Sequence, residues 1–247
     1  MRKLLKSALL TATVVALGLT SSLAIADPSA ADLMKKYDNI MGPANFQAVT
    51  LMSAHRDDGT TRAYKMEVLK KGSEHFLVNF SEPAAVKGQQ MLRSGDNLWV
   101  YMPSLKRAVR LANRDSFQGG DFNNADVLRV NYEADYAGSV TADPARPDAH
   151  VLELKAKTTN ASYDKIKLWM RKADLLPVKG EYYTVSGKML RMAEFSDFRD
   201  FGGIKRPGKI VMKNMLATQR YSTMQWESFD PKYDPPSTKF SLDNLGK

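Results

Sequence analysis

The first apolar pattern in the chain has the spacing of a helix. Five apolar residues recur three or four positions apart, as on one helical face: Leu33, Met34, Tyr37, Ile40 and Met41. Ser29 precedes them as a candidate N-cap, and Gly42-Pro43 ends the pattern. We therefore expect one amphipathic helix near this end of the chain.

From Phe46 onward, apolar residues occupy every second position, which is the pattern of strands that bury one face. Turn residues separate the first strands at Asp58-Gly59, Gly72-Ser73 and Gly95-Asp96. In the second and third strands we assign six residues to the inward face: Tyr64, Met66, Val68, Phe76, Val78 and Phe80.

The same alternation resumes after residue 130 and continues in short segments to Phe229, with turn residues between them. Short hairpin connections of this kind favour one large, strongly curved antiparallel sheet. We predict a mainly β fold with a few helices, about ten to eleven strands, and a single domain over residues 27–247. The proline-rich tail after Asp230 is expected to lie extended along the body.

One insert, residues 116–130 (SFQGGDFNNADVLRV), interrupts the rhythm of strands. Gly119 and Gly120 give the backbone conformational freedom after a strand, and Asp121 is a candidate helix cap. The helix would have an apolar underside that it cannot bury alone: Phe122, Val127, Leu128 and Val130. We predict a lid across the mouth of the curved sheet; the alternative is a packed helix that never moves.

The N-terminus has the pattern of a secretory signal. Arg2, Lys3 and Lys6 precede a short apolar run, and Ala24 and Ala26 predict cleavage after Ala26. The alternative is a membrane anchor, but the run is shorter than the roughly 20 residues that a spanning helix needs. With no cysteine, the chain has neither a disulfide nor a thiol for lipid attachment. We expect an exported, soluble, periplasmic protein.

The net charge of +9 stays positive after removal of the three basic residues of the signal. Export argues against nucleic acid as a partner, so anionic lipid headgroups or an acidic partner fit this charge better. Solubility alone is the alternative explanation.

The sequence offers no catalytic constellation. The three histidines fall in different hairpins, a cysteine nucleophile is excluded, and no nucleophile elbow, phosphate loop or metalloprotease helix is present. Glu181, Glu194 and Asp197 are possible acid–base partners, although surface acids are common on strands. We expect a protein that is not an enzyme and uses neither a cofactor nor a metal.

Thirteen methionines, the initiator included, are spread over many strands. Methionine accommodates varied apolar partners, so this distribution favours a cavity that takes lipid, with ordinary gap-filling as the alternative. Four methionines join the six inward residues as candidate cavity lining: Met91, Met102, Met170 and Met212.

Two stretches resemble the LolA-like family of outer-membrane lipoprotein-sorting proteins. The first carries Gly95, Asp96, Trp99, Tyr101, Pro103 and Arg107, followed by Gly119, Gly120, Asp121, Phe122 and Asp126. The second carries Gly203, Pro207, Ile210 and Met212. Gly120 stands where the family usually has serine, and the resemblance covers nearly the whole mature chain.

This resemblance implies an open, incomplete β-barrel whose concave face is covered by helices. Such proteins carry acyl chains through the periplasm, and the best-known carrier holds its lid with a strand arginine, for which Arg93 is a candidate here. The hypothesis is a monomeric carrier of lipoprotein acyl chains or lipid. It would serve an inner-membrane exporter-type transporter and an outer-membrane acceptor, with transient contact to anionic membrane. The alternatives are a sensor or accessory module that reports envelope lipid, and an enzyme that modifies a lipid.

Overall fold

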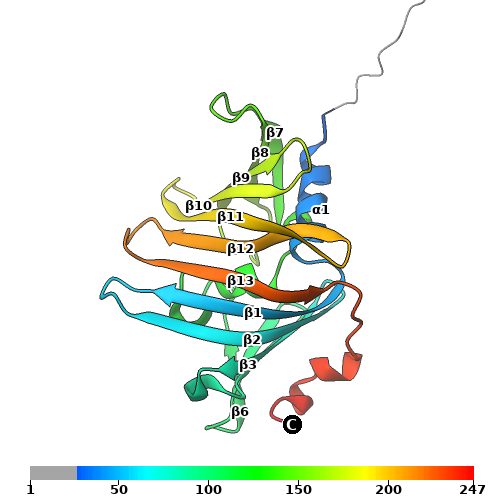
Figure 1. Ribbon diagram of the computed structural model, residues 1–247, viewed down its shortest axis with the longest axis vertical. Helices are drawn as coiled ribbons and strands as arrows, with labels where there is room; N and C mark the ends of the chain where they lie inside the picture. The colour runs from blue at the N-terminus through cyan, green and yellow to red at the C-terminus, as the bar shows by residue number, and fades with distance from the viewer. Residues whose placement is uncertain (1–26) are drawn as a thin grey trace, which may run out of the picture.

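The computed structural model describes residues 27–247, so the predicted signal peptide, residues 1–26, lies outside the described part of the chain. Figure 1 shows the strands of this part as one sheet. Its helices are α1 (Ala30–Met41), α2 (Asn124–Leu128) and α3 (Tyr132–Asp135), with four short 3-10 turns: η1 (Ala84–Val86), η2 (Phe117–Gly119), η3 (Ser237–Phe240) and η4 (Leu242–Asn244). The strands are β1 (Asn45–His55), β2 (Thr61–Lys71), β3 (His75–Glu82), β4 (Gln90–Ser94), β5 (Asn97–Met102), β6 (Arg107–Leu111), β7 (Tyr136–Thr141), β8 (Ala149–Ala156), β9 (Lys165–Arg171), β10 (Pro177–Tyr183), β11 (Met189–Phe201), β12 (Ile204–Asn214) and β13 (Tyr221–Asp230).

The sheet is antiparallel, and its order is β6-β5-β4-β3-β2-β1-β13-β12-β11-β10-β9-β8-β7. Within the described residues, β6 and β7 form its two edges and do not pair with each other, so the sheet stays unclosed. The predicted mainly β, antiparallel, open architecture is confirmed. The sheet has thirteen strands, more than the ten or eleven expected.

The inward face of the sheet carries the main apolar cluster. Met66 lies opposite Phe80, and Val68 opposite Val78, so β2 and β3 present the same face at each paired position. All six residues assigned inward from the sequence are buried in this cluster. The period-two pattern therefore identified the correct face of these strands.

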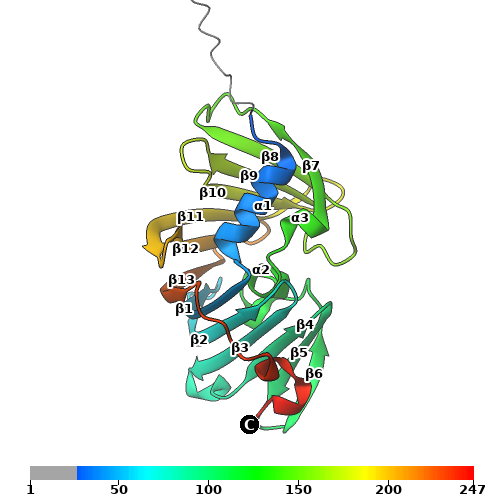
Figure 2. The same ribbon diagram turned by 90° about the vertical axis from the view of Figure 1, so that its right-hand side faces the viewer.

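Helix α1 packs against that cluster. Ser29 and Asp32 form a capping box at its start, and the backbone N–H of Gly42 closes its last turn, as the sequence predicted. Its five periodic apolar residues are buried in the main cluster. Figure 2 shows α1 running beside α3, with α2 below them.

The C-terminal tail covers part of the opposite face of the sheet. Leu69, Leu77 and Leu92 point away from the main cluster and pack with Phe240 and Leu245. The prolines of the tail led us to expect an extended segment. The tail is instead interrupted by the two 3-10 turns η3 and η4 (Figure 2). These turns bring the two apolar side chains onto the sheet.

Candidate functional site

A cavity lies between the inward face of the sheet and the helices. Its volume is only about 60 Å³, far below the roughly 300 Å³ of pockets that bind drug-sized ligands. Strands, α1 and the segment between β6 and β7 all contribute apolar lining: Tyr37, Met41, Phe46, Val68, Phe76, Phe122, Ala125, Val127, Val130, Phe195, Ile210, Met212, Met224 and Trp226. Polar side chains also border it: Thr50, Asp126, Arg129, Asp135 and Ser162. The cavity is thus mostly apolar and nearly filled by the protein's own side chains.

The predicted lining residues fall into three groups. Val68, Phe76 and Met212 line the cavity. Six others are buried deeper in the same cluster: Tyr64, Met66, Val78, Phe80, Met91 and Met170. Met102 is partly buried and packs against that cluster. The structure therefore gathers all ten in one apolar body, but only three of them border the cavity.

Residues 116–135, which we call the strap, connect β6 to β7 and contain η2, α2 and α3. The predicted helix is shorter than expected and begins later. Asn123, not Asp121, is the N-cap of α2, in a capping box with Asp126. Phe122 and Leu128 are buried in the main cluster, and Phe122 and Val127 line the cavity. The apolar underside of the strap thus faces the cavity, as predicted.

Asp121 ties the strap to the sheet instead of capping a helix. Its buried carboxylate accepts hydrogen bonds from Asn214 Nδ2 at 2.9 Å and from Ser222 Oγ at 3.0 Å. Gly119 adopts a positive φ of 71°, which favours glycine. At Gly120 an added Cβ would lie 2.4 Å from Cε of Met52 and 3.0 Å from Oγ of Ser222, so a larger residue there would have to displace these side chains.

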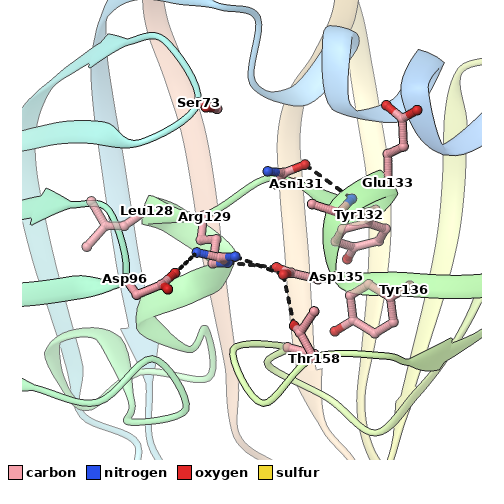
Figure 3. A network of polar contacts seen from close by, with 12 residues as sticks. Ser73, Asp96, Leu128, Arg129, Asn131, Tyr132, Glu133, Asp135, Tyr136 and Thr158 are labelled. Carbon is pink, nitrogen blue, oxygen red and sulfur yellow. Dashed lines mark hydrogen bonds and ion pairs between the residues drawn. The ribbon is translucent and has the colours of Figure 1, made fainter.

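Arg129 links the strap to the β4–β5 turn through Asp96 and also pairs with Asp135 within the strap (Figure 3). Its guanidinium donates to both carboxylate oxygens of Asp135, at 2.7 and 2.8 Å, and to Oδ1 of Asp96, in the β4–β5 turn, at 2.8 Å. Thr158, after β8, also donates to Asp135 at 3.0 Å. The hydrogen bond and charge of Asp135 raise the pKa of Arg129. A bidentate pair of this kind fixes orientation as well as charge.

Arg93, the predicted lid-holding residue, does lie at the end of α2. Its Nη1 donates to the carbonyl oxygens of Ser73, at 3.2 Å, and Leu128, at 3.3 Å. The side chain is buried, and burial followed by the positive charge of Arg129 lowers its pKa to about 10. The role of Arg93 in holding the strap stays a prediction.

Two carboxylates on the helices, Asp126 of α2 and Asp38 of α1, lie in environments that disfavour their charge. Asp126 accepts from the Tyr163 hydroxyl at 2.8 Å, and burial raises its pKa to about 6. Asp38, on α1, accepts from the backbone N–H groups of Tyr132 and Glu133 at 2.8 and 3.0 Å. Burial raises its pKa to about 6 as well. Asp38 therefore caps α3 and joins the two helices.

Sequence reasoning missed most of these polar residues. Asp38, Arg129 and Asp135 act through tertiary pairing, which strand and helix periodicity do not reveal. The pairing of tyrosine rings was also missed, with ring centroids 4.5 Å apart for Tyr37–Tyr132 and for Tyr163–Tyr182. A cluster of charges directly after the predicted lid helix was the one available signal.

Among residues 27–247, no group of three or more acidic, histidine or cysteine side chains is arranged to hold a metal ion. In the same range, no helix has the length and apolar character needed to cross a membrane. What the geometry offers is an apolar lining, a few buried polar groups and two covering elements.

An unclosed sheet of thirteen antiparallel strands, with an apolar cavity under α1 and the strap, places the protein in the class of open β-barrel folds. A LolA superfamily protein from Nitrosomonas europaea matches with a TM-score of 0.80 and 30% identity, over 89% of this chain and 100% of that one. A family model of uncharacterised proteins matches residues 72–247. The chain belongs to the LolA superfamily.

Two further solved structures share the fold at 20% identity. One is a DUF1329 family protein from Desulfovibrio piger, with a TM-score of 0.78 over 87% of this chain and 97% of that chain. The other, from Vibrio parahaemolyticus, is a domain assigned to outer membrane lipoprotein sorting, with a TM-score of 0.74 over 88% and 98%. No functionally curated protein matches the chain by sequence.

Proposed function

We propose that the protein is a periplasmic carrier that binds the acyl chains of a lipoprotein or a lipid and transfers them between envelope membranes. Membership in the LolA superfamily supports this proposal, as does the lipoprotein-sorting assignment of the Vibrio structure. The predicted signal peptide supplies the route to the periplasm.

The small volume of the covered cavity carries the proposal. Only about 60 Å³ is open in a space bordered by strands, α1 and the strap, and most of its lining is apolar. An acyl chain fits only after a covering element moves away from the concave face. Each Å² of chain surface then buried contributes about 25 cal/mol. We assign the opening to the strap, because water can replace the polar contacts that help to hold it on the sheet.

Delivery needs a donor and an acceptor. We assign these roles to an exporter-type transporter of the inner membrane and to an acceptor in the outer membrane. The basic surface favours transient contact with anionic membranes. The carrier acts as a monomer, without a cofactor and without catalysis.

A cavity-filling variant tests the binding site. Ala125 lies on α2, is buried and borders the cavity, whereas Ala134 on α3 is exposed. Ala125→Leu should weaken binding of an environment-sensitive acyl probe at least about tenfold, a difference of roughly 1.4 kcal/mol. Ala134→Leu is the matched control and should bind as the unmodified protein does. Equal binding by both variants would place the acyl site elsewhere.

Vesicle transfer tests the carrier role. The protein should accelerate movement of a fluorescent lipid from donor to acceptor vesicles in proportion to its concentration. Binding without accelerated transfer would contradict the carrier role and favour a sensor.

A further inference from the structure

Three buried cations follow one end of the inward face of the sheet, and none belongs to the strap. They are Lys70 on β2, Arg93 on β4 and Arg206 on β12, which we call the cation row. Lys70 lies opposite Phe76 in the β2–β3 register, and Phe76 lies opposite Arg93 in the β3–β4 register. The cations thus occupy inward positions of the same sheet whose apolar side chains line the cavity.

Aromatic rings separate the members of the cation row. The Arg206 guanidinium lies 3.9 Å from the ring centroid of Phe229 and 4.4 Å from that of Trp226. The Lys70 ammonium lies 5.3 Å from the centroid of Phe76, and the Arg93 guanidinium 5.9 Å from the same ring. Rings of this kind stabilise a cation but cannot neutralise its charge. Phe76 and Trp226 also border the cavity, so the cations lie directly behind its wall.

The cation row has fewer hydrogen-bond acceptors around it than its N–H donors need. Arg206 is fully buried, and its one hydrogen bond runs from Nη2 to the Met41 carbonyl at 3.5 Å. Its Nε and Nη1 have no partner in residues 27–247, and neither does Nε of Arg93. Within that range, no carboxylate lies within ion-pair distance of any of the three cations. Buried charges are ordinarily paired, because an unpaired one costs stability.

Lys70 and Arg206 converge on the turn that ends α1. Lys70 Nζ donates to the carbonyl oxygens of Gly42 and Pro43, the latter at 2.8 Å, while Arg206 reaches the adjacent Met41 carbonyl. The hydrogen bonds that Lys70 donates to the end of α1 explain its position. The Nε and Nη1 donors of the planar Arg206 guanidinium, by contrast, have no acceptor in residues 27–247. Nε and Nη of an arginine match two oxygens of a carboxylate or phosphate.

We propose that the cation row, with Arg206 as its principal member, binds the anionic group of an acyl ligand whose chain occupies the cavity. The ligand is therefore an acylated oxyanion, a carboxylate or a phosphate, and not a neutral lipid. The anion enters beside Met41 and replaces the long carbonyl contact of Arg206. This inference rests on the proposed function and specifies its ligand class.

Matched ligands separate the inference from the proposed function. Displacement of an acyl probe is measured with 1-palmitoylglycerol, which is neutral, with its 3-phosphate, and with palmitate. The phosphate or the carboxylate should bind at least about tenfold more tightly than the neutral compound, as charge-assisted hydrogen bonds imply. The tighter of the two anions identifies the source of the oxyanion. Equal affinities overturn the inference but leave the carrier intact, whereas no binding of any compound overturns the proposed function.

Variants locate the effect at the cation row. Arg206→Met should abolish the preference for the anion, leave the neutral compound within about threefold, and leave the melting temperature unchanged or higher because an unpaired buried charge is gone. Arg62→Met, an exposed arginine on β2, is the matched control and should keep the preference. Lys70→Met supplies a second reading if Arg206→Met fails to fold, and should reduce the preference. A lower melting temperature with equal loss of all three ligands would show that Arg206 serves only the end of α1.

Discussion

The two elements that cover the cavity are held in different ways. Helix α1 buries five apolar side chains in the main cluster over twelve residues. The strap offers two helices of five and four residues; it buries Phe117, Phe122 and Leu128 in the same cluster. It is also held by hydrogen bonds and an ion pair through Asp121, Arg129 and the Leu128 carbonyl. Helix α1 is fixed mainly by apolar burial, whereas the strap combines buried apolar side chains with exchangeable polar contacts.

This difference indicates which cover moves. Polar groups released from the strap regain hydrogen bonds with water, so their net loss is small. Apolar side chains lifted from the cluster lose their full burial free energy. The strap therefore has the lower free energy of opening, while α1 stays with the sheet.

Truncation of the α1 anchor should have the largest effect. Leu33 is fully buried, so Leu33→Ala should lower the free energy of unfolding by about 2–5 kcal/mol. Urea denaturation measures the change, with exposed Lys35→Ala as the control. A Leu33→Ala protein of normal stability with faster ligand exchange would instead make α1 the moving cover.

Removal of Arg129 should act on the strap alone. Arg129→Met eliminates the ion pair with Asp96 in the β4–β5 turn and the bidentate pair that orders Asp135 within the strap, and should lower the free energy of strap opening by about 1–3 kcal/mol. Hydrogen exchange should accelerate in residues 116–135 while α1 keeps its protection. Ligand exchange should speed up by more than the change in global stability explains. Uniform acceleration over the whole chain would contradict a separately opening strap.

Acidification should raise the stability of the folded protein, because it neutralises two buried carboxylates. The pKa values of Asp38 and Asp126 are raised to about 6 by burial, so the folded protein takes up protons more readily than the unfolded chain. Their stabilising contribution is complete below the ordinary value of 3.8 and is lost as the pH rises through about 6. Unfolding in urea should cost about 1 kcal/mol more per group at pH 5 than at pH 7.

Charged neighbours offer the control for this pH effect. Lys70 faces Asp38 and Arg191 faces Asp126, and both favour the ionised carboxylate, whereas Glu133 opposes ionisation of Asp38. Asp38→Asn and Asp126→Asn should each remove part of the difference between pH 5 and pH 7. A difference unchanged in the double variant would assign it to other groups.

Loss of the exposed ion pair should have the smallest effect. The side chain of Asp96 is 65% exposed, so Asp96→Asn should change strap opening by no more than about 1 kcal/mol. Added salt should mimic this variant by screening the pair. If Asp96→Asn opened the strap as far as Arg129→Met, the buried pair of Arg129 with Asp135 inside the strap would contribute nothing to holding it closed.

The sequence predicted the parts of this fold that depend on local periodicity. The alternation in β2 and β3 identified the inward face, and Ser29 marked the start of α1. Asp121 was assigned to a helix cap because aspartate is common at caps. In the structure its carboxylate instead accepts tertiary hydrogen bonds from Asn214 and Ser222. No local pattern anticipates partners about a hundred residues away in the chain.

The cation row left a signal that was not used. Lys70 occupies the same face as Met66 and Val68, and Arg206 the same face as Ile210 and Met212, so both interrupt apolar inward patterns. A charge at an inward strand position either finds a partner or marks a site. The register was readable from the sequence, but the absence of a carboxylate partner required the structure.

The pairing of β1 with β13 has a consequence for how the chain matures. These neighbours in the middle of the sheet come from opposite ends of the described sequence, with Gln47 opposite Asp230. The sheet cannot be completed until the last strand has emerged from the ribosome or the export channel. Until then, β1–β6 form a partial sheet whose apolar face has no cover, a state prone to aggregation. Folding speed and chaperone dependence should therefore be governed by the arrival of β13, and not by the hairpins that form first.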